Sequence, residues 1–142
     1  MGFQVKVEGG SGAFEINREN ILTVEYKSDI PGDSNARSKD QGATLTVTGK
    51  ILTGLGGLVG DATIELGKWS LVPSESAEAY RNIKVDVLAA NQVVRSYTLP
   101  NAFVIDYKED YSDTSGTGKF TLVARQKKDK LAGVAIEGGY AF

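Results

Sequence analysis

Strict alternation of apolar and polar residues constrains the fold of this chain more than any other feature of its sequence. Residues 3–8 alternate without exception. Residues 43–52 place Leu45, Val47 and Ile51 on one face and mostly threonines on the other. Successive side chains of a β-strand point to opposite faces of a sheet, so this period is typical of a strand with one buried face. Both segments are therefore predicted to be half-buried strands.

The same period predicts a series of further strands along the chain. They cover residues 20–27, 62–66, 83–89, 92–99, 101–111, 119–127 and a segment within residues 131–142. In the first of them Leu22, Val24 and Tyr26 share a face. A tight turn is predicted at Ala90 and Asn91. Glycine accounts for 17 of the 142 residues and lies mostly between the strands, as in sandwiches and barrels. The prediction is a mainly β fold, either a β-barrel or two packed antiparallel sheets.

One segment departs from the period of two and predicts a single short helix. Residues 73–81 begin with Pro73 and acidic residues and end with Arg81. Proline fits the first turn of a helix, and this order of charges matches the helix dipole. No internal repeat or low-complexity linker divides the chain, and 142 residues is the usual size of one domain. Residues 1–142 are therefore expected to form one β domain that carries this helix.

The absence of histidine and cysteine limits the chemistry that the chain can perform. A Ser-His-Asp triad, a Cys-His dyad and a histidine-bearing zinc site are all excluded. A net charge of −2 gives no reason to expect binding to nucleic acid. Apolar runs stay far below the ~20 residues of a membrane-spanning helix, and the N-terminal residues lack the apolar region of a signal peptide. We expect no cofactor, no metal, no recognition of nucleic-acid sequence and no membrane insertion.

The sequence Asp113-Thr114-Ser115-Gly116 is one residue away from the Asp-Thr-Gly signature of aspartic proteases. Those proteases need two such loops whose aspartates share a proton. They also carry glycine directly after the threonine or serine, whereas Ser115 intervenes here, and no apolar residue precedes Asp113. The alternating segments on both sides and the turn-forming residues 112–118 instead predict a β-hairpin.

A glycine-rich segment, Gly-Leu-Gly-Gly-Leu-Val-Gly at residues 54–60, resembles a phosphate-binding loop because it follows a predicted strand. A dinucleotide fingerprint also needs a helix whose N-terminus meets the phosphates. Residues 61–66 look like another strand, and no Gly-Lys-Ser or Gly-Lys-Thr sequence is present. A hairpin loop is therefore the preferred interpretation.

A long polar stretch, residues 28–42, lies between two predicted strands. Loops of this length within one domain are usually either functional or disordered. Two interpretations remain open: a flexible connection, or a contact with a partner.

The predicted strand at residues 101–111 carries apolar residues on both faces. Its large side chains are assigned to the core, namely Phe103, Ile105 and Tyr107. The residues between them then face outward, namely Ala102, Val104 and Asp106. One small core has little use for both faces, and exposed strand edges favour pairing with a neighbouring chain. If the strand lies in the wall of an assembly, the face that carries Val104 meets either a neighbouring chain or the lumen.

Two stretches near the C-terminal end carry a resemblance to a known family. They are residues 97–107, Tyr-Thr-Leu-Pro-Asn-Ala-Phe-Val-Ile-Asp-Tyr, and residues 118–122, Gly-Lys-Phe-Thr-Leu. Together with the order of the predicted elements, they resemble the paired C-terminal strands of the tube proteins of contractile injection systems. This family includes Hcp of type VI secretion and the tail tube proteins of contractile phages.

The resemblance implies a structural subunit, not an enzyme, that assembles into hexameric rings stacked as a hollow inner tube. Residues 28–42 fall where the family has its extended stacking loop. That position makes four residues candidate assembly contacts beside Val104: Asp33, Asn35, Arg37 and Lys39.

The resemblance also implies partners and a location. Sheath and baseplate proteins are the expected partners, and the tube is a passive conduit that a contracting sheath pushes outward. The subunit is expected to assemble in the cytoplasm and then join a phage-tail-like particle or secretion apparatus. Two other classes remain open: a monomeric β-barrel binding or adaptor module, and a hydrolase that uses carboxylates.

Overall fold

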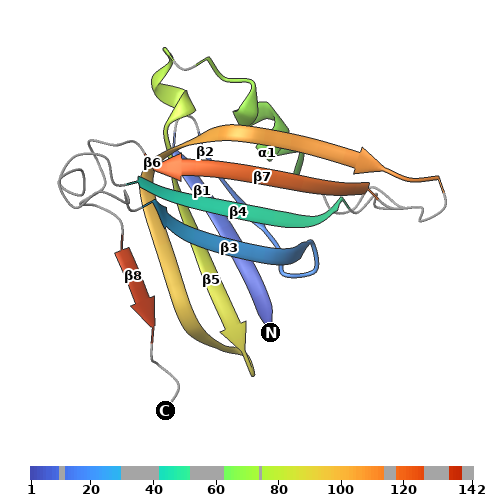
Figure 1. Cartoon of the computed structure of the whole chain (residues 1–142), viewed down its shortest axis with the longest axis vertical. Coiled ribbons are helices and arrows are strands. Elements are labelled where there is room, and N and C mark those ends of the chain that lie inside the picture. Colours follow the sequence, from blue (N-terminus) through green and yellow to red (C-terminus); the bar gives the residue numbers. More distant parts are fainter. Residues whose placement is uncertain are drawn as a thin grey trace.

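Antiparallel strands dominate the computed structural model, which describes residues 1–9, 12–29, 42–51, 63–73, 75–113, 118–126 and 135–138 (Figure 1). The strands are β1 (Gly2–Gly9), β2 (Gly12–Ile16), β3 (Ile21–Asp29), β4 (Gly42–Ile51), β5 (Arg81–Ala89), β6 (Gln92–Tyr111), β7 (Gly118–Gln126) and β8 (Ala135–Gly138). A short helix, α1 (Thr63–Ser70), and a 3-10 turn, η1 (Ala77–Ala79), follow β4 in the sequence and precede β5. The predicted mainly β fold is confirmed.

The longest strand, β6, connects two layers of the sheet. The strand order is β2-β1-β5-β6-β7-β4-β3, β8 also pairs with β6, and every pairing among the described residues is antiparallel. β6 pairs with β5 as far as Ala102 and with β7 from Ala102 onward. In Figure 1 the strands β7, β4 and β3 cross the direction of β1 and β5, so the sheet bends at β6. The result is two packed antiparallel layers, one of the two predicted arrangements.

The bend in β6 lies at Asn101. This residue has a φ of 55°, a left-handed conformation that asparagine tolerates better than most residues do. Its backbone N–H donates a hydrogen bond to Oδ1 of Asn82 on β5, at 3.1 Å. The pairing between β5 and β6 also shifts its register here. A bulge of this kind bends a strand, which lets β6 leave one layer and enter the other.

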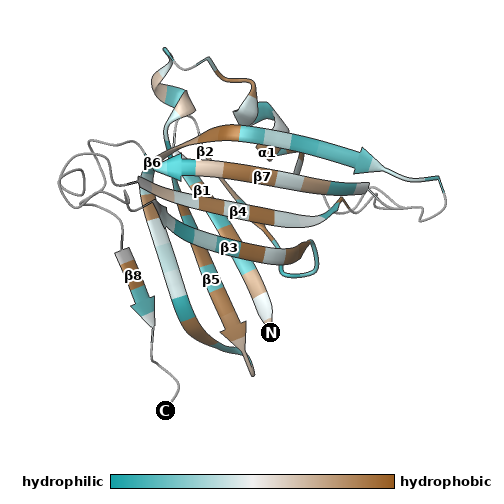
Figure 2. Cartoon of the chain, viewed as in Figure 1, coloured by the Kyte–Doolittle hydropathy of each residue, from teal (hydrophilic) through white to brown (hydrophobic). Residues whose placement is uncertain are grey.

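The hydrophobic core lies between the two layers. β1 and β5 contribute Val5, Val7, Ile83 and Val85, and β4 and β7 contribute Leu45, Val47, Phe120 and Leu122, all at most 1% exposed. Tyr26 of β3 stacks on Tyr97 of β6 with ring centroids 4.6 Å apart, which joins the layers through aromatic packing. Figure 2 shows the alternation of hydrophobic and hydrophilic residues along the strands that produces this core. The predicted burial of Leu45 and Val47 is confirmed.

The helix α1 lies where the sequence predicts a strand. Residues 62–66 alternate, but α1 spans Thr63–Ser70, so this prediction is wrong. Thr63, Leu66 and Trp69 are buried and lie three residues apart, the spacing of one helix face. An apolar pattern of only five residues fits both periods, and it therefore cannot separate a strand from a helix.

The segment predicted to be the helix, residues 73–81, forms only the turn η1 among its described residues. Ser76 caps this turn, because its hydroxyl accepts a hydrogen bond from the Glu78 N–H at 3.2 Å. Tyr80 is already extended, and β5 begins at the next residue. Of the residues in η1, Ala79 alone is buried, so the segment offers too little apolar surface to hold a longer helix.

Two short elements remain: the strand β2 and the tight turn between β5 and β6. The strand β2 was not predicted, because its five residues give only Phe14 and Ile16 as an apolar face. It pairs with β1. The tight turn between β5 and β6 is confirmed, with positive φ angles of 53° at Ala90 and 63° at Asn91, as two-residue hairpin turns require.

Candidate assembly surface

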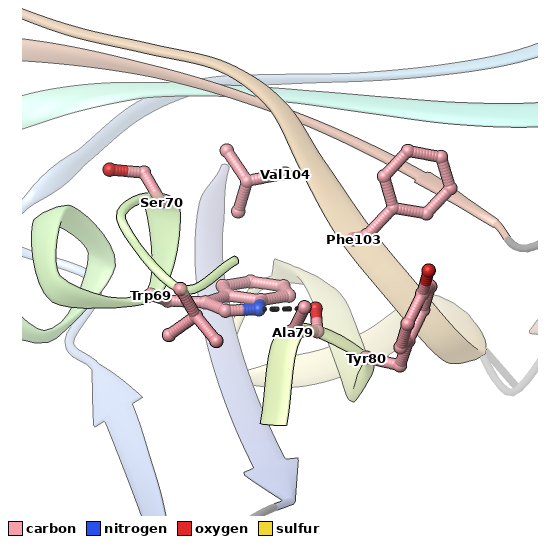
Figure 3. Close-up of a pocket in the computed structure, with 7 residues that line it drawn as sticks. Trp69, Ser70, Ala79, Tyr80, Phe103 and Val104 are labelled. Carbon is pink, nitrogen blue, oxygen red and sulfur yellow. Dashed lines mark hydrogen bonds between the residues drawn. The ribbon is translucent and has the colours of Figure 1, made fainter. Parts of the chain in front are cut away.

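In the C-terminal half of β6, residues 102–105 face the opposite way from the prediction: the residues predicted to face the core face outward, and the reverse. Ala102 is fully buried, and Val104 is half-buried against the core. Phe103 lies on the other side of the strand from Val104 (Figure 3), and Ile105 is 47% exposed. The assignment of Phe103 and Ile105 to the core is therefore wrong, as is the outward assignment of Ala102 and Val104.

Two register shifts in β6 explain this reversal. Beside Asn101, β6 has one more residue than β5 opposite it, so the side chains after the bend exchange faces. Between Val104 and Asp106, β6 has one more residue than β7, and that residue is Ile105. The second shift restores the original faces, so Tyr107 packs against the core as predicted. Alternation in a sequence assumes an uninterrupted strand, so it gives the wrong face wherever a strand contains an extra residue relative to its partner.

The outward apolar residues on this part of the fold form a patch, which we call the β6 patch: Tyr80, Phe103 and Ile105. Tyr80 packs edge-on against Phe103, with ring centroids 5.9 Å apart and the rings inclined by 66°. Ile105 occupies a bulge, a feature that re-aims a side chain. Asp106 follows Ile105, and Arg125 lies opposite Phe103 on β7. An apolar centre beside charged residues is the usual composition of a protein interface.

Behind the β6 patch, α1 and η1 close a small pocket of about 100 Å³ (Figure 3). It is lined by Trp69, Ser70, Val72, Ala79, Tyr80, Phe103 and Val104. The indole N–H of Trp69, which is 1% exposed, donates a hydrogen bond to the Ala79 carbonyl oxygen at 2.9 Å. The Arg81 guanidinium lies 5.7 Å from the centroid of the same ring. These contacts fix η1 to α1 and thereby hold Tyr80 in place.

Val104, the predicted contact on this strand, is turned toward α1. It lines the pocket together with Trp69 and packs against the core. Its side chain packs against the core, which those of Tyr80 and Phe103 do not, and the neighbouring Ile105 is exposed. In this part of β6 the exposed apolar side chain is therefore Ile105 rather than Val104.

The protease-like motif lies at the end of the β6–β7 hairpin. The pairing extends to Tyr111 and Gly118, which confirms the predicted hairpin. Glu109 accepts hydrogen bonds from the hydroxyls of Tyr107, at 2.5 Å, and of Tyr111. Asp113 is exposed, and residues 114–117 lie outside the described residues. An exposed aspartate beside a hairpin turn lacks the enclosed environment in which protease aspartates share a proton.

The long polar loop connects β3 and β4, and the last pair at its base is Asp29 and Gly42. The candidate assembly contacts in it lie outside the described residues: Asp33, Asn35, Arg37 and Lys39. β3 is the last strand in the sheet order. The residues on either side of this stretch, Asp29 and Gly42, are therefore paired at one edge of the sheet.

The glycine-rich segment at residues 54–60 also lies outside the described residues. The expectation that a strand follows it is wrong, because helix α1 begins at Thr63. A dinucleotide fingerprint nevertheless belongs to a parallel βαβ unit. β4 and β5, the strands on either side of α1, are not neighbours in the sheet, and the pairings that the structure describes are antiparallel. The predicted hairpin is also wrong, because the next described element after β4 is helix α1 and not a strand.

The sequence predicts neither a membrane-spanning helix nor a metal site anywhere in the chain, and the structure describes part of it. Within the described residues, neither helix has the length and apolar character needed to cross a membrane. The same residues include no group of three or more acidic, histidine or cysteine side chains placed to hold a metal ion.

This arrangement of strands matches solved structures over nearly the whole chain. Hcp1 from Flavobacterium johnsoniae is 18% identical, with a TM-score of 0.61 over 98% of this chain and 97% of Hcp1. The chain shares the fold of Hcp1. A chain in the baseplate of the anti-feeding prophage is 14% identical, with a TM-score of 0.56 over 96% of this chain and 92% of its own length.

A further match comes from the sheath–tube complex of an extracellular contractile injection system, PVC, in its extended state. Its chain is 14% identical, with a TM-score of 0.52 over 96% of this chain and 88% of its own length. No protein-family model matches the chain, and no curated protein matches its sequence. The predicted resemblance to Hcp and the tube proteins of contractile injection systems is therefore confirmed at the level of the fold.

Proposed function

We propose that this chain is the tube subunit of a phage-tail-like contractile injection apparatus. In this proposal its copies form hexameric rings, and the rings stack into the inner tube. The observation that carries the proposal is the match of 96–98% of the chain to Hcp1, to a baseplate chain and to a chain of a sheath–tube complex. Matches that extend over the full chain argue that the whole fold, rather than a shared motif, serves the same role.

The proposed mechanism is mechanical. The subunit supplies the wall of a conduit, and a contracting sheath pushes that conduit outward. Sheath and baseplate proteins are the proposed partners, and assembly takes place in the cytoplasm before the tube joins the particle. The lack of histidine and cysteine fits a part that performs no catalysis.

The β6 patch is the proposed contact between neighbouring subunits of a ring. Ile105 is exposed and is aimed outward by a bulge, and the half-buried rings of Tyr80 and Phe103 lie beside it. A contact between two different surfaces of identical chains generates a ring when its rotation closes. The loop at residues 30–41, with its candidate contacts Asp33, Asn35, Arg37 and Lys39, is the proposed stacking contact between rings.

Sedimentation velocity and negative-stain microscopy of the purified protein test the proposal, and rings or short tubes are the expected result. Ile105→Asp should weaken the association by at least about tenfold, because it places a charge in a desolvated contact. Its melting temperature should stay close to that of the wild type, since Ile105 is already exposed. Ile136→Asp is the matched control, because Ile136 is 50% exposed on β8, outside the β6 patch.

Compact monomers of the wild type at every concentration would contradict the proposal and favour the monomeric adaptor module. Cleavage of unfolded casein that disappears in Asp113→Ala would favour the carboxylate hydrolase. Equal loss of assembly in Ile105→Asp and Ile136→Asp would leave the tube function in place but remove the β6 patch from the ring contact.

A further inference from the structure

A groove of about 380 Å³ lies at the turn end of the β6–β7 hairpin, and we call it the hairpin groove. It is lined by Leu22, Lys50, Asp110, Tyr111, Ser112, Gly118 and Lys119. Its apolar floor is open to solvent, because Leu22 is 44% and Tyr111 is 66% exposed. The Tyr111 ring lies over Gly118, its partner across the strands, where a Cβ atom would be 2.5 Å from the ring.

Leu22 was predicted to share the face of Val24, and its exposure corrects that prediction. The register between β3 and β4 shifts between Ile21 and Thr23. Ile21 is 7% exposed and fills the core position, whereas Leu22 is left outside. The bulge therefore leaves Leu22 outside the core, where it adds apolar surface to the groove beside Tyr111.

Two lysines line the groove beside Leu22 and Tyr111. Lys50 of β4 and Lys119 of β7 are directly opposite each other in the register. Asp110 of β6 lies directly opposite Lys119 and also lines the groove, and its carboxylate pairs with Lys108 at 3.7 Å. Among the described residues, neither Lys50 nor Lys119 forms an ion pair within 4.0 Å, so one carboxylate is surrounded by three lysines. Like charges at opposed strand positions destabilise a sheet. The two ammonium groups therefore gain from an anionic partner that enters the groove.

The end of α1 carries the complementary set of side chains, which we call the acidic turn: Leu71, Glu75 and Glu78. Leu71 is 82% exposed directly after the helix. Glu75 and Glu78 are exposed, and neither carboxylate has an ion-pair partner within the described ranges. The hydrogen bond from Trp69 to Ala79 ties the two ends of this segment together, so the turn is presented from a fixed base.

The acidic turn and the hairpin groove lie near opposite ends of the C-terminal half of β6. η1 lies beside the start of this half, where Tyr80 packs against Phe103, and the hairpin groove lies at its far end, where Tyr111 pairs with Gly118 (Figure 1). Two complementary surfaces at separate places on one chain meet when copies contact each other head to tail.

We infer that the hairpin groove of one copy binds the acidic turn of a second copy. The leucine of the turn packs on the apolar floor, and its two glutamates face the two lysines of the groove. This inference rests on the proposed assembly of the chain and adds which surfaces meet. Charge complementarity supplies the register of the contact, and the apolar side chains supply the area removed from water.

Disulfide cross-linking tests the geometry, because the chain has no cysteine of its own. Leu71→Cys and Ser112→Cys are made in separate proteins, mixed and oxidised. Cross-linked dimers are expected in the mixture well above those of either protein alone, since a disulfide forms only when the two Cα atoms come within about 7 Å. Ile136→Cys, at another exposed apolar residue, replaces Leu71→Cys as the matched control and should give only background dimers.

Charge reversal tests the electrostatics. A variant with Lys50→Glu and Lys119→Glu should associate at least about tenfold more weakly, and so should a variant with Glu75→Lys and Glu78→Lys. All four substitutions in one chain should restore association, because the attraction then acts with exchanged signs. Thermal melts show that each variant folds.

Wild-type rings combined with background cross-linking would overturn this inference and leave the proposed tube function intact. The same holds if both double variants assemble normally, or if the fourfold variant folds without regaining association. A wild type that stays monomeric would overturn the inference and the proposed function together.

Discussion

The two halves of β6 differ in what holds them in the fold. The half that ends at Ala102 pairs with β5 along one edge and, over four residues, with β8 along the other. Among the described residues, the half that ends at Tyr111 pairs with β7 alone, and α1 and η1 pack beside it. Backbone pairing depends little on which side chains are present, whereas packing depends on each of them. The second half should therefore be more sensitive to substitution, and it is also the half that carries the exposed bulge at Ile105.

The largest loss of stability is expected in the layer formed by β7, β4 and β3, where one large side chain fills the core. Phe120 of β7 is fully buried, and Phe120→Ala should lower the free energy of unfolding by about 3–5 kcal/mol, through lost burial and a cavity. Urea denaturation measures this change. Thr121→Ala, on the opposite face of the same strand, should cost about 0.5 kcal/mol. Similar costs for the two variants would show that packing does not hold this layer.

A smaller effect separates the two faces of β6. Val104→Asp should lower the free energy of unfolding by about 2–3 kcal/mol, because its carboxylate would be placed against the core. Ile105→Asp should change it by no more than about 0.5 kcal/mol, because the side chain is exposed. Chemical denaturation of both variants measures the difference. If Ile105→Asp is the costlier change, the face assignment from alternation is right and the observed one is wrong.

The smallest effect is expected at the bend between the halves. Asn101→Val should cost about 1–2 kcal/mol, because a branched side chain resists a φ of 55°. Asn101→Gly keeps both the conformation and the backbone hydrogen bond to Asn82, so it should be close to neutral. Thermal melts of the pair measure the difference. Equal destabilisation by both substitutions would mean that the asparagine side chain, rather than the backbone angle, holds the bend.

Alternation predicted most strands because each buries one face against the other layer. It identified β1, β4 and β7 together with their buried residues, such as Val5, Leu45 and Phe120. It failed at α1, where Thr63, Leu66 and Trp69 follow a helical spacing that a five-residue window does not reveal.

The candidate surface was predicted only in part. The sequence identified the strand that carries it, but the inserted residues at Asn101 and Ile105 exchange its faces, and an insertion relative to a partner strand is visible only once the partner is known. The same reason hid the exposure of Leu22. The long polar loop was recognised from its composition, and its contacts remain a prediction.

The strand that belongs to both layers also has a consequence for how the fold bears force. Backbone hydrogen bonds resist sliding along a strand collectively, whereas they open one after another when a strand is peeled away. Because β6 changes direction at Asn101, a pull that slides it along β7 also pulls across its pairing with β5. The covalent backbone of β6 transmits force from one layer to the other, and the bend is the point at which shear in one layer becomes peeling in the next.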